Sequence, residues 1–195
     1  MEDAVRFHGH LCPMSALGVR MGRLALKTLA RGREKGVKLI AVVEFNNCIS
    51  DGIQYVCGTT YGKNNLFYKE HGKFAASFYD LATGKSVRIR IKNEVVEEAL
   101  VYGKAAQEVR KLPPADREEE AKNLLNQGRK IVEKFEKMQD DELFSITEAP
   151  PFKPEEEPSL EHVYCEECGE IVLEDFVKVD NGEKVCIGCL EREKS

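Results

Sequence analysis

Two groups of histidine and cysteine residues mark where this sequence could do chemistry. The first is the stretch FHGHLCP, which places His8, His10 and Cys12 two residues apart near the amino terminus. The second is a pair of Cys-x-x-Cys motifs, CEEC at 165–168 and CIGC at 186–189. Imidazole and thiolate groups bind transition metals, and a thiolate is also a nucleophile. The sequence therefore predicts two sites with different chemistry.

The carboxy-terminal motifs have the spacing of a structural zinc site. Four thiolates satisfy the tetrahedral preference of zinc, and each short pair can form a tight knuckle. We expect Cys165, Cys168, Cys186 and Cys189 to be the ligands. The alternative is two disulfides, or thiols that only pack. The segment resembles a treble-clef finger of the kind seen in DksA/TraR-like proteins. The acidic residues around it argue against DNA as its partner.

The amino-terminal stretch permits a second metal site or a reactive thiol. In an extended segment, residues two apart point the same way, so the three side chains could converge. Pro13 suits the first position of a helix, which makes Cys12 its N-cap. The positive end of a helix dipole favours a thiolate there. The alternative is that one histidine packs in the core with its hydrogen bond satisfied and that Cys12 is only a small buried residue.

The elements that must position these residues follow from hydrophobic spacing and turn residues. We expect a helix from Pro13 to about Gly32, a buried strand at 37–45, a short helix within 46–58, strands at 66–70, 74–81 and 86–92 with hairpin-like turns between them, and helices at 94–112 and 116–137. This pattern predicts the α+β class, with an antiparallel sheet packed against helices.

The chain divides by composition into three parts. Residues 1–147 are long enough to bury a core, and 162–195 are too few to fold without a metal. Between them, 148–161 carries four prolines and five glutamates, so we expect a linker. The net charge of −5 argues mildly against a general nucleic-acid binder. No apolar run suits a membrane span or a signal peptide, and we expect a cytoplasmic protein.

Two separated blocks carry a resemblance to a known family. The stretch FHGHLCPMSALGVRMG at 7–22 and the stretch CISDGIQYVCGTTYGKNNL at 48–66 look like the two motifs of the FmdE family, which is named after formylmethanofuran dehydrogenase. The similarity covers roughly 4–145. It implies an α+β core, often dimeric, with a metal-binding pocket. Carried over residue by residue, the family motif gives His8, His10, Cys12, Cys48, Asp51, Gln54, Gly62 and Lys63.

The sequence departs from the family motif at two places. Met14 stands where the family has a glycine, and Thr59 stands where it has a cysteine. Cys57 lies before Gly58 instead of after it, so its equivalence to the family cysteine is in doubt. Cys48 is then the best second sulfur for the pocket.

The resemblance, taken together with the chemistry of the side chains, implies roles for the core residues. Candidate catalytic residues are Cys12, His10 and Cys48, and candidate core metal ligands are these three with His8. Candidate substrate-binding residues are Asp51, Gln54 and Lys63. Asp51 can cap its helix or orient an imidazole. The run GTTYGKN at 58–64 is one residue shorter than the P-loop motif, and Asn64 stands where that motif has Ser or Thr. We therefore do not expect a P-loop.

The resemblance to the FmdE family implies a metal-binding accessory protein for formylmethanofuran dehydrogenase or related one-carbon, molybdenum or tungsten enzymes, and a homodimer is expected on the same grounds. Its cofactors would be a structural zinc in the tail and a metal of unknown identity in the core. Its partners would be a second copy of the chain and the chains of a partner oxidoreductase. The alternatives are a small metal- or thiol-dependent enzyme that uses Cys12, or a regulator that acts through its zinc finger.

Overall fold

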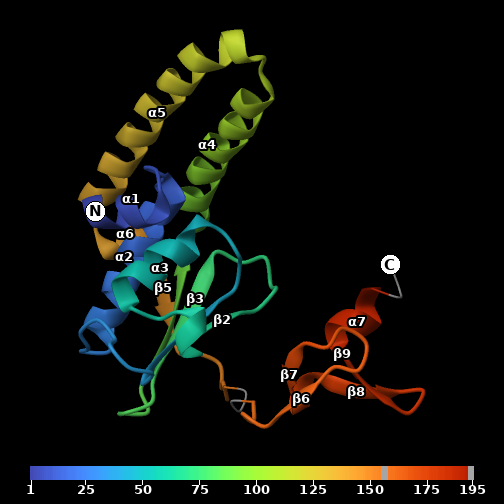
Figure 1. Cartoon of the computed structure of the whole chain (residues 1–195). Helices are drawn as coiled ribbons and strands as arrows, with labels where there is room; N and C mark the ends of the chain where they lie inside the picture. The colour runs from blue at the N-terminus through green and yellow to red at the C-terminus, as the bar shows by residue number, and fades with distance from the viewer. Residues whose placement is uncertain (155–157, 193–195) are drawn as a thin grey trace. The chain divides into compact units, whose positions relative to one another are not determined.

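The computed structural model describes residues 1–154 and 158–192, and the chain forms two compact units, Met1–Pro151 and Phe152–Ser195 (Figure 1). The first unit holds a five-stranded sheet in the order β2-β1-β3-β4-β5. Its strands are β1 (Leu39–Val43), β2 (Leu66–Tyr68), β3 (Ala75–Asp80), β4 (Ser86–Ile91) and β5 (Phe144–Thr147). Its helices are α1 (Glu2–His8), α2 (Pro13–Thr28), α3 (Cys48–Cys57), η1 (Tyr61–Lys63), α4 (Asn93–Lys111), α5 (Pro114–Lys137) and α6 (Asp140–Leu143). The predicted α+β class is confirmed.

The strand pairing differs in one respect from the sequence expectation. β3 and β4 form the expected antiparallel hairpin, but β2 pairs in parallel with β1 rather than with β3. The connection from 69 to 74 therefore crosses β1 and is not a hairpin. β5 was not expected, and it adds an antiparallel edge beside β4. Edge strands of this kind are short and half exposed, so their sequence pattern is weak.

The helices before and after β1 are close to their expected ranges. α2 begins after Cys12 as predicted, but it ends at Thr28, four residues before Gly32. The chain turns just after this helix at Ala30, which has a φ of 52°. α3 is capped by the side chain of Asn47, which accepts from the amide of Ile49 at 2.9 Å, and not by Asp51. α4 and α5 form a long antiparallel pair of helices (Figure 1).

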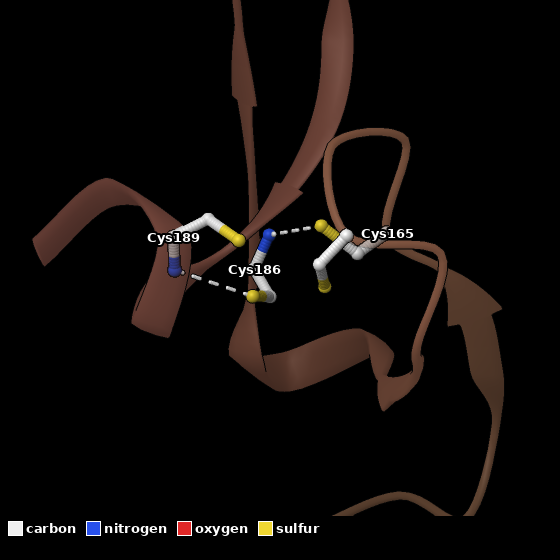
Figure 2. A group of neighbouring side chains, drawn as sticks. Cys165, Cys186 and Cys189 are labelled. Atoms are coloured by element: carbon white, nitrogen blue, oxygen red, sulfur yellow. Dashed lines mark hydrogen bonds between the residues drawn. The ribbon is translucent and has the colours of Figure 1, made fainter. Parts of the chain in front are cut away.

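The second unit consists of two small hairpins and a short helix. Its elements are β6 (His162–Tyr164), β7 (Ile171–Leu173), η2 (Glu174–Phe176), β8 (Val177–Asp180), β9 (Glu183–Cys186) and α7 (Ile187–Arg192). β6 pairs with β7, and β8 pairs with β9. Figure 2 shows Cys165, Cys186 and Cys189 with their sulfurs gathered between these elements. Three of the four buried hydrophobic residues in this unit's core are cysteines, and the fourth is Val185.

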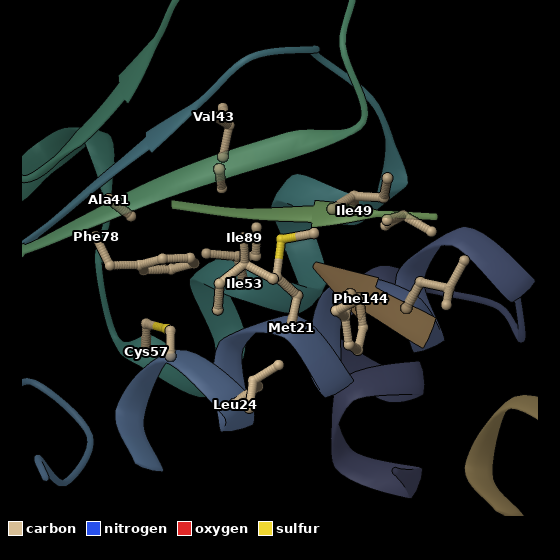
Figure 3. Close-up of a cluster of buried hydrophobic side chains, with 14 of the residues drawn as sticks. Met21, Leu24, Ala41, Val43, Ile49, Ile53, Cys57, Phe78, Ile89 and Phe144 are labelled. Carbon is tan, nitrogen blue, oxygen red and sulfur yellow. The ribbon is translucent and has the colours of Figure 1, made fainter. Parts of the chain in front are cut away.

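The core of the first unit lies between one face of the sheet and the helices α2 and α3 (Figure 3). Strand β4 alternates, with Val87, Ile89 and Ile91 buried in this core. Arg88 and Arg90 therefore lie on the opposite face of the same strand. No helix among the described residues is long and apolar enough to cross a membrane.

Candidate metal centres

The cysteines of the second unit converge as a four-sulfur group. The Sγ atoms of Cys165, Cys168, Cys186 and Cys189 all lie within 4.8 Å of one another. The amide of Cys186 donates to the sulfur of Cys165 at 3.3 Å, and the amide of Cys189 donates to the sulfur of Cys186 at 3.4 Å (Figure 2). Backbone amides, that of Cys168 first, lower the pKa of Cys165 to about 6. Such an arrangement suits a metal ion that prefers four thiolates.

The first unit holds a second group made of His8, Cys12 and Cys48. A ring nitrogen of His8 and the two sulfurs lie within 4.8 Å of one another. Three protein ligands leave one position of a tetrahedron free, which is the arrangement of exchangeable or catalytic sites rather than closed structural ones. This group could hold a metal with a thiolate and imidazole preference.

The two nitrogens of His8 have different surroundings. Nδ1 lies 2.7 Å from Oδ2 of Asp51, which fixes the ring orientation from a helix 43 residues away in sequence. Nε2 is buried and has no hydrogen-bond partner in the described structure. A buried polar atom without a partner costs free energy, so it calls for an explanation. A metal ion on Nε2 supplies one, because metal-bound histidines are commonly held by a carboxylate on the other nitrogen.

The two thiols of this group have opposite proton affinities. A hydrogen bond from Cys48 and the amides of Ser15 and Met14 lower the pKa of Cys12 to about 5, against burial that acts to raise it. The same contact with Cys12, together with burial, raises the pKa of Cys48 far above its ordinary range. The lowered pKa favours the thiolate form of Cys12, and its place at a helix N-terminus acts in the same direction.

Close packing of α2 against α3 brings the two sulfurs together. A Cβ atom on Gly18 would lie 2.1 Å from the carbonyl oxygen of Ile49. A Cβ atom on Gly52 would lie 2.4 Å from the carbonyl oxygen of Ser15. Only glycine at both positions permits this approach. Cys12 caps one of these helices and Cys48 begins the other, so the short distance between the helices sets the distance between the sulfurs.

The histidines reach the site by a turn and not by an extended segment. α1 ends at His8, and Gly9 adopts the left-handed conformation with a φ of 90°. The extended geometry expected for 8–12 is therefore wrong for its first half. His10 stacks beside His8, with ring centroids 4.4 Å apart, but it is exposed and lies outside the three-residue group. A catalytic role for His10 stays a prediction.

The predicted substrate-binding residues lie in different places. Asp51 contacts His8 and so belongs to the metal-capable group rather than to an open pocket. Gln54 is half buried, three residues further along α3. Lys63 donates from Nζ to the carbonyl oxygen of Gly58, which holds the η1 turn against the end of α3. Gly62 has open space around its Cα.

Cys57 lies in the hydrophobic core and away from the metal-capable groups of the described chain. Its side chain is fully buried among the hydrophobic side chains (Figure 3). Its sulfur lies 3.8 Å from the carbonyl oxygen of Gly22. Burial raises its pKa to about 12. Thr59 is also fully buried, and its hydroxyl has no hydrogen-bond partner among the described residues. Met14 packs against the core, which accounts for a large side chain there.

Tyr102 on α4 lies near Cys12 and was not singled out from the sequence. Burial raises the pKa of its phenol, and the negative charge of Cys12 raises it further. Its ring fits against α5 because position 128 is glycine, where a Cβ atom would lie 2.7 Å from the phenol oxygen. The sequence does not indicate that Tyr102 lies near Cys12, because Tyr102 belongs to an ordinary amphipathic helix far from the cysteine motifs.

Comparison with known proteins identifies the family and the relatives of this chain. Residues 7–145 match the family described as FmdE, Molybdenum formylmethanofuran dehydrogenase operon. A "Probable S-adenosyl-L-methionine-binding protein" of Archaeoglobus fulgidus is 33% identical over 194 residues. This match covers 95% of the chain but 51% of the relative, so the chain spans about half the length of that relative.

A solved structure shares the fold. It is a tungsten formylmethanofuran dehydrogenase FmdE-like protein from Syntrophus aciditrophicus, with a TM-score of 0.59 and 23% sequence identity. The likeness covers 100% of this chain and 91% of that one. The family match covers more than two thirds of the sequence and therefore shows the family. The chain belongs to the FmdE family.

Proposed function

We propose that this protein binds a metal ion through His8, Cys12 and Cys48, with one coordination position open. The observation that carries the proposal is the buried Nε2 of His8, which has no partner in the described structure while Asp51 holds the opposite nitrogen. The metal would supply Lewis acidity at the open position. The chain's own residues supply two sulfurs, one imidazole nitrogen and the carboxylate that orients the ring.

We further propose that this site serves an accessory role to formylmethanofuran dehydrogenase or a related one-carbon, molybdenum or tungsten enzyme. Family membership supports this role. The proposal includes zinc in the four-cysteine group and a cytoplasmic homodimer that works with the chains of the partner oxidoreductase. We do not extend S-adenosylmethionine binding from the Archaeoglobus relative to this chain, because the match spans only 51% of that protein.

Metal content of the full-length protein tests the core site. We expect two metal ions per chain in the wild type, one in His8→Ala and in Cys48→Ser, and one in Cys168→Ser. Asp51→Asn should weaken the core metal about 10- to 100-fold, because it removes the carboxylate that orients His8. Cys57→Ala is the matched control and should keep both ions, since its sulfur lies in the hydrophobic core. Unchanged metal content in His8→Ala and Cys48→Ser would contradict the proposal.

A second candidate function is a thiol-dependent enzyme that uses Cys12 as nucleophile. The pKa of about 5 at Cys12 favours it, because the thiolate is the reactive form. Iodoacetamide labelling separates the two functions. A metal ligand should be protected in the metal-loaded protein and alkylated after chelation. Rapid alkylation of Cys12 in the metal-loaded protein would instead favour the thiol enzyme.

A further inference from the structure

The first unit has a cavity of about 420 Å³ that none of the metal-capable residues lines. It lies where the loop at 72–74 with the start of β3, the end of β4 and the first turn of α4 meet. Its size falls within the range of small-molecule sites in proteins, roughly 300–1,000 Å³. Its lining joins charged and apolar side chains, among them Lys73, Phe74, Arg88, Arg90, Ile91 and Val96.

A buried ion pair forms the fixed part of this cavity. The Nε and Nη2 groups of Arg88 donate to the two carboxylate oxygens of Glu44 at 2.6 and 2.9 Å. The side chain of Glu44 is only 7% exposed. This two-point contact holds the guanidinium in one orientation. It leaves Nη1 without a hydrogen bond in the described structure, so its two N–H groups remain available to a ligand.

Two further cations line the cavity. Arg90 lies on the same face of β4 as Arg88, and its Nη1 makes only long contacts of 3.4 and 3.5 Å. The Nζ of Lys73 has no partner among the described residues. Three cations stand against the carboxylates of Glu44 and Glu97, which leaves a net charge of +1. Glu44 is already paired, so Glu97 is the one acidic side chain in the described lining that competes with an anion.

The first turn of α4 adds positive potential at the same place. Asn93, the first residue of this 19-residue helix, lines the cavity, and the N-cap residue Lys92 makes no side-chain hydrogen bond to the helix amides. The amide of Val95 already donates to the carbonyl oxygen of Lys92 at 3.1 Å, so the first two amides of the helix and the positive end of its dipole are what favour an anion here. This contribution reinforces that of the three cationic side chains.

The opposite part of the lining is apolar. It is formed by the side chains of Phe74 and Val96, which are both half buried. The ring of Phe74 is held edge-on by Phe45, with centroids 5.2 Å apart and an interplanar angle of 75°. A fixed aromatic wall beside cations recognises a ligand with an apolar body and a charged head, and neither half alone satisfies the whole cavity.

We propose that this cavity binds a small organic anion, with a carboxylate or phosphate monoester head at Arg88, Arg90 and Lys73 and an apolar body against Phe74 and Val96. This site is separate from the metal site, and the proposal does not depend on the proposed metal function.

Calorimetric titration of the full-length protein with four probes tests it. The probes are phenyl phosphate, benzoate, inorganic phosphate and benzyl alcohol. We expect one of the two organic anions to bind at least tenfold more tightly than inorganic phosphate and benzyl alcohol. Which of phenyl phosphate and benzoate binds better identifies the head group. The His8→Ala protein should bind the preferred probe as well as the wild type does.

Two variants divide the cavity into its halves. Arg90→Ala should weaken the preferred organic anion at least tenfold, and Arg110→Ala, at an exposed arginine near the other end of α4, should leave it unchanged. Phe74→Ala should weaken the organic anion but not inorganic phosphate. The proposal is overturned if neither organic anion binds, if Arg90→Ala binds as the wild type does, or if inorganic phosphate binds as tightly as the organic anions.

Discussion

Individual side chains here gain their properties from partners that lie far away in the sequence. Asp51 does not cap the start of its own helix. Its carboxylate is instead hydrogen-bonded to the ring of His8, which lies 43 residues earlier in the sequence. Asp80 is 2% exposed, and it accepts hydrogen bonds from Thr83, Ala82 and Arg31. Burial acts to raise the pKa of Asp80, but these bonds outweigh it and the pKa is lowered. Each carboxylate therefore links two segments through its negative charge.

Asp80→Asn should lower the free energy of unfolding of the first unit by about 3 kcal/mol at pH 7, because Arg31 loses a buried charge partner. The folded pKa of Asp80 is lowered, so its contribution is complete above the ordinary pKa near 4 and disappears as the pH falls through the folded value. The difference in the free energy of unfolding between the wild type and Asp80→Asn should therefore become smaller as the pH falls. Urea unfolding at several pH values measures it.

The matched control for this measurement is Asp141→Asn, an exposed aspartate of α6. Its effect should stay within about 0.5 kcal/mol across the same pH range. A difference between wild type and Asp80→Asn that grows on acidification would contradict the assigned role of the carboxylate.

At the scale of elements, the contact between α2 and α3 decides whether the core site exists. Each helix start supplies one sulfur, and glycines at positions 18 and 52 allow the two backbones to touch. The unexpected parallel pairing of β1 with β2 has a related cause. The chain leaves α3 through Gly58 and the η1 turn, and this path returns it to the outer edge of β1. Helix packing thus sets the geometry of the site, and the turn after α3 sets the place of β2 in the sheet.

Gly18→Ala should destabilise the first unit by about 3 kcal/mol and reduce its core metal content. The added methyl group meets the backbone carbonyl of Ile49, which cannot move without shifting α3. Gly103→Ala is the same chemical change inside α4, where nothing lies within 4 Å. It should stabilise the protein by about 0.5–1 kcal/mol through helix propensity. Thermal unfolding and metal analysis of both proteins test this contrast, and equal behaviour would refute the packing argument.

At the scale of the whole molecule, the two units draw their stability from different sources. The first has an extensive apolar core between sheet and helices. The second buries few apolar groups other than its cysteines among the described residues, so we expect a metal bound to these cysteines to supply much of its folding free energy. We therefore expect the two units to respond independently to substitution of the cysteines in either group.

Cys168→Ser should unfold the second unit and leave the first one folded. Limited proteolysis should then cut rapidly within 158–192, while a fragment of about 150 residues survives. Cys48→Ser is the matched control, because it removes a sulfur from the other group and should leave the second unit resistant. Resistance of 158–192 in Cys168→Ser would show that this unit folds without its fourth sulfur.

The sequence by itself determined the features whose partners lie close together along the chain. The two Cys-x-x-Cys motifs, the start of α2 after Cys12, the helices predicted at 94–112 and 116–137, and the antiparallel β3–β4 hairpin all rest on local spacing and turn chemistry. Family membership followed from two such local motifs.

Only the tertiary structure decided which distant groups meet. It joined His8 with Asp51 and Cys48, placed Cys57 in the hydrophobic core, added β5 to the sheet, and formed the cationic cavity beside α4. The physical reason is that these contacts depend on how closely helices and strands pack. A local pattern records which face of an element is apolar, but it does not record which element will lie against that face.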